Sequence, residues 1–117
     1  EYLPVMFPGF SWHNLNGGAL NQIPRVGGQF LWDQVYADVV TVDANMIYVA
    51  MFDEVDEGTA IFKITNNPPR LGGVDMFVTP SYDGIPLPSD EYLWLTGQAA
   101  RALRNEIPVN QTRPARP

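Results

Sequence analysis

Hydrophobic residues gather in four segments of the chain, and polar segments rich in glycine and proline separate them. Residues 2–7 form a short apolar run that Pro8 and Gly9 close, a pattern that predicts a buried strand followed by a turn. Residues 45–52 are continuously apolar, which is typical of a strand buried on both faces of a parallel sheet.

The other two apolar segments have the spacing of amphipathic helices. Residues 29–42 carry one apolar stripe at steps of three and four residues, made by Leu31, Val35, Val39 and Val42. A second helix is predicted after Ser89, its expected N-cap, and it ends before Pro108. Trp32 and Trp94 lie on these helices, so we expect them to pack in the core or between the helices.

Residues 10–28 and 66–88 lack periodicity and are predicted to be long loops, although residues 75–78 have an extended pattern. Residues 60–64 fit either a helical turn or a strand. The order strand, long loop, helix, strand, long loop, helix predicts an α/β fold with two βα units, parallel strands and outer helices. Both loops follow the carboxyl ends of strands, where such folds hold their functional residues.

We expect residues 1–107 to form this α/β unit and residues 108–117 to form a polar tail. Two parallel strands cannot bury both of their faces by themselves, so the unit is expected to need neighbours. The chain begins at Glu1 without an initiator methionine and enters a strand almost at once, which leads us to expect the end of a longer protein.

Composition excludes several classes of function. The chain has 117 residues, enough for one domain, and its 13 acidic and 7 basic residues give a net charge of −6 with no basic run. This balance argues against a nucleic acid or an anionic membrane surface as partner, and no apolar stretch reaches the ~20 residues that span a bilayer. Without cysteine and with His13 as the single histidine, no disulfide, thiol nucleophile or multi-histidine metal centre is expected, and no cofactor is implied.

Four carboxylates follow the second predicted strand: Asp53, Glu54, Asp56 and Glu57. On a helical turn or a tight loop, positions three apart become neighbours, so Glu54 and Glu57 are candidates for a catalytic pair that acts on a glycosidic bond. A solvated acidic helix start explains the same spacing about equally well. A divalent cation bound by the four carboxylates is a third, weaker hypothesis, because the spacing is not that of a known calcium loop.

Aromatic and polar side chains in the loops suit a carbohydrate pocket, since sugar rings stack on aromatic faces and form hydrogen bonds at their rims. The candidates are Trp12, His13, Asn14, Phe52 and Tyr82. A role for Trp12 or Tyr82 in covering the edge of the core, and a locally satisfied histidine, are the alternatives.

Two further residues carry candidate roles. Arg25, near the end of a glycine-rich loop, either binds a substrate oxygen or pairs with an acidic loop residue. Asn110 begins an Asn-Gln-Thr glycosylation sequon in the tail, which permits a secreted origin.

Three segments resemble the C-terminal part of glycoside hydrolases of the clan that holds families 71 and 99, which includes the endo-α-mannosidases. They are residues 7–12 (Phe-Pro-Gly-Phe-Ser-Trp), Gly27-Gly28 and residues 51–61 (Met-Phe-Asp-Glu-Val-Asp-Glu-Gly-Thr-Ala-Ile). The last segment is similar to a Phe-Asn-Glu-Trp-x-Glu-Gly-Thr-x-Ile motif of family 99. The resemblance extends over about residues 2–105.

The resemblance implies a (β/α)8 barrel, of which this chain supplies the last strands and helices, and a retaining mechanism on α-linked sugars. Carried over by position, Glu54 is the base that acts on the sugar 2-hydroxyl to form an anhydro intermediate, and Glu57 is the general acid and then base. Asp53, Val55 and Phe10 stand where family 99 has Asn, Trp and Tyr, so the chain is closer to the family 71/99-like proteins.

The sequence therefore predicts a secreted glycoside hydrolase, or part of one, with a carbohydrate as its partner and with Asp53 also in the sugar site. The alternative is a non-catalytic, lectin-like carbohydrate-binding protein that is built from the end of the barrel and self-associates. A purely structural fragment left by proteolysis is the third interpretation. None of the motifs specifies the sugar or the linkage.

Overall fold

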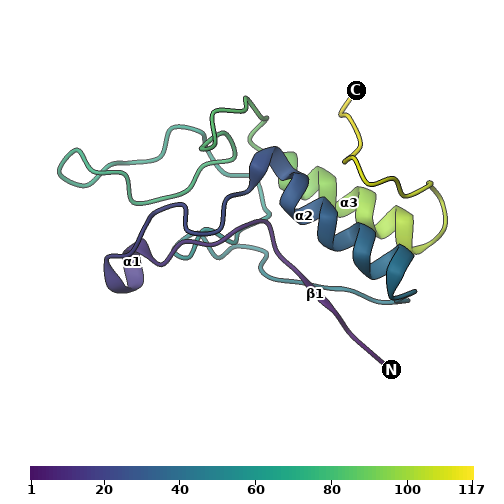
Figure 1. The fold of residues 1–117 in the computed structure, drawn as a ribbon. Helices are drawn as coiled ribbons and strands as arrows, with labels where there is room; N and C mark the ends of the chain where they lie inside the picture. The colour runs from purple at the N-terminus through teal and green to yellow at the C-terminus, as the bar shows by residue number, and fades with distance from the viewer.

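Two short parallel strands lie beside a pair of packed helices in the computed structural model, which describes all residues from 1 to 117 (Figure 1). Strand β1 (Val5–Met6) pairs with β2 (Tyr48–Val49), so that Val5 lies opposite Tyr48 and Met6 opposite Val49. The expected parallel pairing within an α/β fold is confirmed. The sheet has only these two strands and is not a closed barrel.

The strands are shorter and more exposed than the apolar runs predict. Val5 is 52% exposed and Tyr48 is 48% exposed, whereas Met6 on the other face is 2% exposed. The prediction that residues 45–52 are buried on both faces is therefore wrong. The physical reason is that no further strand or layer covers the outer face, so the side chains alternate between the core and solvent.

Both predicted helices are confirmed: the first has the expected boundaries to within one residue, and the second ends at Leu103, ahead of the expected stop at Pro108. Helix α2 (Gln29–Tyr36) continues directly into a π-helical turn, η2 (Ala37–Thr41), and α3 runs over Glu91–Leu103. Asp90 rather than Ser89 is the N-cap of α3, because the Ser89 carbonyl accepts a hydrogen bond from the Ile64 amide and so belongs to the preceding loop.

The two long loops differ in regularity. The first loop contains the single-turn helix α1 (His13–Asn16) and the 3-10 turn η1 (Val26–Gly28), neither of which the sequence pattern predicted. The second loop, residues 66–88, has no helix or strand, as expected. Residues 60–64 are neither helix nor strand. They run back along the segment that follows β2, where the Ile61 amide donates to the Met51 carbonyl at 3.0 Å.

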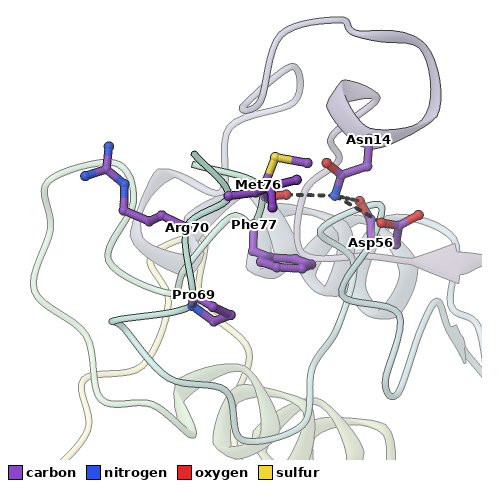
Figure 2. A pocket seen from close by; sticks show the side chains of 7 residues that line it. Asn14, Asp56, Pro69, Arg70, Met76 and Phe77 are labelled. Atoms are coloured by element: carbon purple, nitrogen blue, oxygen red, sulfur yellow. Dashed lines mark hydrogen bonds between the residues drawn. The ribbon is translucent and has the colours of Figure 1, made fainter. Parts of the chain in front are cut away.

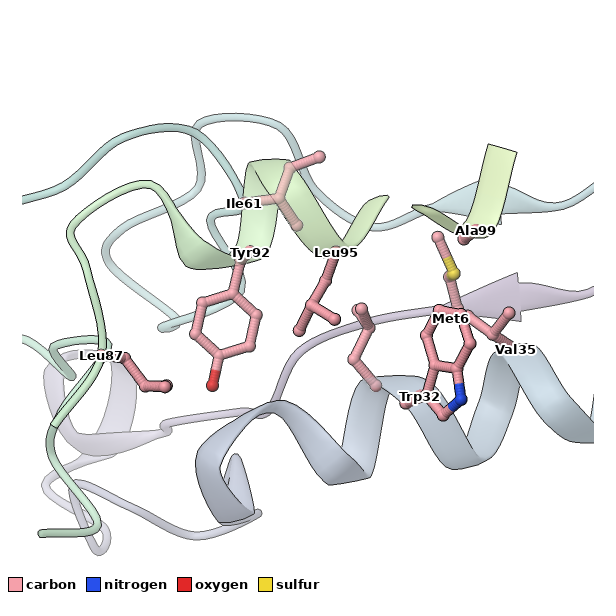
Figure 3. Close-up of a cluster of buried hydrophobic side chains, with 9 residues drawn as sticks. Met6, Trp32, Val35, Ile61, Leu87, Tyr92, Leu95 and Ala99 are labelled. Carbon is pink, nitrogen blue, oxygen red and sulfur yellow. The ribbon is translucent and has the colours of Figure 1, made fainter. Parts of the chain in front are cut away.

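The core lies between α2, α3 and the inner face of β1 (Figure 3). It consists of nine buried side chains: Met6, Leu31, Trp32, Val35, Ile61, Leu87, Tyr92, Leu95 and Ala99. Trp32 is 1% exposed, and Trp94 packs against the cluster from α3, as predicted.

The C-terminal segment, residues 108–117, lies against the two helices. The Trp32 indole donates to the Asn110 carbonyl at 2.8 Å, and the Arg113 amide donates to the Gln29 side chain at 3.1 Å. Arg113 also forms an ion pair at 2.8 Å with Glu91, whose side chain is 1% exposed. These contacts tie the polar tail to the first turns of both α2 and α3.

The loops that follow the carboxyl ends of β1 and β2 extend to the same side of the molecule, away from the far ends of α2 and α3 (Figure 1). This arrangement places the segments with the candidate site residues next to one another. None of the helices is both long and apolar enough to cross a membrane.

Candidate functional site

The candidate site is built on a tight turn that follows β2, here called the acidic turn (residues 53–58). Its two arms are joined by backbone hydrogen bonds, with the Met51 amide bonded to the Thr59 carbonyl at 3.1 Å and the Thr59 amide to the Glu54 carbonyl at 3.0 Å. Within the turn, the Gly58 amide donates to the Val55 carbonyl at 3.2 Å. The four carboxylates therefore lie in one compact turn and not along an extended strand.

The two predicted catalytic glutamates have different surroundings. Glu54 Oε1 accepts hydrogen bonds from the backbone amides of Asp56 at 2.9 Å and Glu57 at 3.3 Å, which fixes the orientation of this carboxylate. The Glu57 side chain is half-buried and forms no hydrogen bond. One carboxylate is held in place by the turn, and the other is free to meet a ligand.

Two segments distant in sequence hold the backbone on the C-terminal side of the turn. The Ser11 amide donates to the Glu57 carbonyl at 2.7 Å, and Arg25 Nη2 donates to the Gly58 carbonyl at 2.6 Å. Gly58 has φ +67°, and a Cβ there would lie 3.3 Å from a Val78 methyl group. Glycine is favoured here because this left-handed backbone strains other residues and because the neighbouring segments approach closely.

Arg25 is buried beneath the acidic turn, with only 1% of its surface exposed. Its guanidinium lies 4.5 Å from the centre of the Tyr92 ring. Burial lowers the pKa of Arg25 and raises the pKa of Tyr92 to about 12, against the opposing effect of the arginine charge on the phenol. Because Arg25 has almost no exposed surface, it cannot contact a sugar directly, which was one of its two expected roles. Its observed partner is a backbone carbonyl of the acidic turn.

Asn14 joins three loops at one point. Its Nδ2 donates to Asp56 Oδ1 at 3.0 Å and to the Met76 carbonyl at 2.8 Å, as Figure 2 shows. Beside these bonds is an open cavity of about 380 Å³, lined by Asn14, Asp56, Pro69, Arg70, Leu71, Met76 and Phe77. An aromatic ring beside amide, carboxylate and guanidinium groups is a combination that suits a sugar.

The other predicted binding residues are not among those that line this cavity. His13 Nδ1 is 3.0 Å from the Gly18 carbonyl, and Trp12, 42% exposed, packs edge-on against Phe10. Phe52 and Asp53 are exposed at the start of the acidic turn. No hydrogen bond joins these side chains to either glutamate.

Tyr82 lies at a second hollow of about 190 Å³, which shares Arg70 and Phe77 with the main cavity. Its neighbour Asp83 bonds instead to Asn21, at 2.6 Å, and to the Val26 amide. Asn110, the sequon residue, is exposed on the docked tail.

Sequence reasoning left six residues of the cavity beside Asn14 out of the predicted site: Asp56, Pro69, Arg70, Leu71, Met76 and Phe77. Asp56 was visible as a carboxylate between the two glutamates, and residues 75–78 as the single apolar stretch of the second loop. Arg70 had no sequence signal, because only the fold brings its loop beside Asn14.

Nowhere in the chain do three or more His, Asp or Glu side chains converge in a way that would hold a metal ion. Comparison of the chain with protein-family models, with curated proteins and with solved structures gives no match.

Proposed function

We propose that the chain carries the two-glutamate centre of a retaining glycoside hydrolase that acts on α-linked glycans. The observation that carries the proposal is the acidic turn, which follows the carboxyl end of a parallel strand and presents one oriented and one unbonded carboxylate. The adjoining cavity, with Phe77 beside Asn14 and Asp56, provides a place for a sugar ring.

In the proposed reaction, Glu54 takes the proton of the sugar 2-hydroxyl while that oxygen attacks the anomeric carbon and forms a 1,2-anhydro sugar. Glu57 protonates the departing glycosidic oxygen, so that the bond to the aglycone breaks. Glu57 then removes a proton from water, which opens the anhydro ring at the anomeric carbon, and Glu54 returns its proton to the 2-oxygen. Two inversions at one carbon leave the configuration retained.

The test is mutation of each glutamate in the intact protein. Glu54→Gln and Glu57→Gln are each expected to lower the hydrolysis of a panel of α-linked mannose oligosaccharides, whose 2-hydroxyl is trans to the leaving group, at least about 100-fold, because an amide neither accepts nor supplies the required proton. Glu106→Gln is the matched control, since Glu106 is an exposed carboxylate beyond α3 that pairs with Arg104. Near wild-type hydrolysis by either of the two acidic-turn variants would overturn the proposal.

A non-catalytic, lectin-like role is the second candidate, and one observation favours it. Glu54 Oε1 is already bonded to two amides of its own turn, and the cavity lining includes Asp56 but neither glutamate. This role predicts saturable binding of the same oligosaccharides without hydrolysis. Incubation of the wild type with these oligosaccharides separates the two candidates, because a lectin-like protein binds them, as titration calorimetry measures, and leaves them intact.

The finer architecture that we propose is the last βα units of a (β/α)8 barrel. In such a barrel helices cover the outer face of each strand, and the other face points inward. Here α2 packs with the Met6 face of the sheet, while Val5 and Tyr48 on the opposite face are about half exposed. A full barrel has ~250 residues, so we propose that the remainder of a barrel or a second copy of the chain covers this face.

A further inference from the structure

We propose that Arg25 is a positioning residue for the acidic turn: it fixes the carbonyl of Gly58 from below and thereby sets where Glu57 is presented. The inference rests on the proposed function for the role of Glu57 and deepens it. The contact itself is a property of this chain, with Nη2 of Arg25 2.6 Å from the Gly58 oxygen.

The first step is the path by which the side chain of Arg25 reaches the turn. It passes the Pro8-Gly9 segment after β1, where a Cβ on Gly9 would lie 2.8 Å from Arg25 Cγ and 2.7 Å from the Ile23 carbonyl. Only glycine leaves this space, so the close approach fixes the direction of the arginine. The Phe10 and Ile23 backbones also pair here, with hydrogen bonds of 3.1 and 3.0 Å.

The second step is the support on the other side of the guanidinium. The centre of the Tyr92 ring, which belongs to the core on α3, lies 4.5 Å from Arg25 Cζ and connects the arginine to that core. A cation over an aromatic face is stabilised by the ring, more so in a desolvated site, which offsets part of the cost of burial.

Third, burial of the Arg25 charge has a further cost that the tyrosine ring does not offset. Arg25 Nε and Nη1 are buried and have no hydrogen-bond partner, although such atoms are normally paired. A side chain that served only to fill space would be more stable as an apolar residue. The one direct polar bond that the buried charge makes is to the Gly58 carbonyl, so we infer that holding this carbonyl is its role.

The fourth step concerns how the turn responds. The Glu57 carbonyl is held by the Ser11 amide at 2.7 Å, and the next carbonyl, that of Gly58, is held by Arg25. Two consecutive peptide groups are thus fixed from two different segments immediately after the Glu57 side chain. Loss of one of these bonds frees the peptide that determines the direction of Glu57.

The kinetic test compares Arg25→Gln, Arg25→Lys and Arg113→Gln in the intact protein on the α-linked oligosaccharide panel. Arg25→Gln is expected to lower kcat about 100-fold with KM nearly unchanged, as a displaced catalytic group does. Arg25→Lys, which retains a charged donor, is expected to restore most of kcat. Arg113→Gln is the matched control, because it removes a partly buried arginine that pairs with Glu91 and forms no bond to the acidic turn. Equal losses of kcat in Arg25→Gln and Arg113→Gln, or none in Arg25→Gln, would refute the positioning role.

Amide hydrogen exchange gives a readout that does not depend on hydrolysis. In Arg25→Gln the amides of Ser11, Gly58 and Thr59 are expected to exchange about tenfold faster, while those in the middle of α3 keep their rates. If Arg25→Gln does not fold, Arg25→Lys is measured in its place, with a smaller increase at the same amides. Wild-type exchange at these amides would overturn the inference, whereas absence of hydrolysis in the wild type would overturn only the proposed function.

Discussion

Asn14 and Arg25 illustrate what a residue's sequence context predicts and what it does not. Both were identified as candidates because polar groups in a loop after a strand often contact ligands. Their actual partners, the Met76 carbonyl and the Gly58 carbonyl, lie 62 and 33 positions further along the chain. Contacts at such separations depend on the packing of whole loops. The sequence therefore predicts that these two polar residues form contacts, but it does not predict with which partners.

The acidic turn is the opposite case. Its carboxylates are contiguous in sequence, and the hydrogen bonds from the Asp56 and Glu57 amides to Glu54 span only two and three residues. A local arrangement of this kind is determined by the turn itself, as in the capping of helices. That the Glu54 carboxylate reaches the Glu57 amide is therefore predictable from spacing.

Asp38 is a buried carboxylate whose charge has a cost in stability. Its side chain is 9% exposed, Oδ2 has no hydrogen-bond partner, and burial raises its pKa. The unfolded chain thus loses this proton at lower pH than the folded protein, and the free energy of unfolding falls as the pH rises above about 4.

Asp38→Asn is expected to raise the free energy of unfolding at pH 7 by about 1 kcal/mol, because a neutral amide costs less to bury than a carboxylate. The gain should disappear below about pH 4, where the aspartate is protonated in both states. Thermal denaturation across this pH range measures both effects. Asp33→Asn, at an exposed position of α2, is the control and should change little. A stabilisation that persists unchanged at low pH would contradict the account.

At the scale of elements, the helices were predicted more accurately than the strands. The stripe that contains Leu31 and Val35 is a local periodic signal, and burial of these residues against α3 follows from it. The apolar runs around the strands carry no information on how many residues find a hydrogen-bonded neighbour. Each strand here has only the other strand as a neighbour, and the pairing extends over two residues in each strand.

The C-terminal segment belongs to the stability of the helices. Arg113 neutralises Glu91, a buried carboxylate in the first turn of α3, and Arg116 lies 3.6 Å from the same carboxylate. The segment also accepts the indole proton of Trp32. Composition predicted the polar character of the tail. It did not predict that the tail docks on the helices, because the residues that hold it are located on α2 and α3.

Arg113→Gln is expected to lower the free energy of unfolding by about 2 kcal/mol, since it leaves Glu91 with a weaker partner in a buried site. Chemical denaturation measures the change, and Arg104→Gln serves as control because its pair with Glu106 is exposed. An unchanged midpoint for Arg113→Gln would show that the tail contributes nothing to the stability of the helices.

At the scale of the whole molecule, the outer face of the sheet is the main unpaired surface. Exposed apolar side chains gather on and beside β1 and β2: Tyr2, Leu3, Val5, Tyr48, Met51 and Phe52. A group of exposed apolar side chains of this kind is typical of an interface. It is consistent with the proposal that further strands or a second copy cover this face.

The double variant Val5→Lys, Tyr48→Lys is expected to dissociate whatever covers the sheet, because two charges would be buried without partners. Native mass spectrometry should show an assembly larger than one chain for the wild type and single chains for the variant. Leu15→Lys is the control, at a residue of α1 that is 67% exposed and belongs to neither strand. A wild type that is a single chain at micromolar concentration would contradict self-association.

The central claim is that Glu54 and Glu57 together cleave an α-linked glycan with retention. The most direct measurement is proton NMR of the sugar that is first released from the oligosaccharide panel, recorded before mutarotation for the wild type, Glu54→Gln and Glu57→Gln. The account predicts that the α anomer appears first with the wild type and that neither variant releases sugar. Initial release of the β anomer, or release by either variant at the wild-type rate, would contradict it.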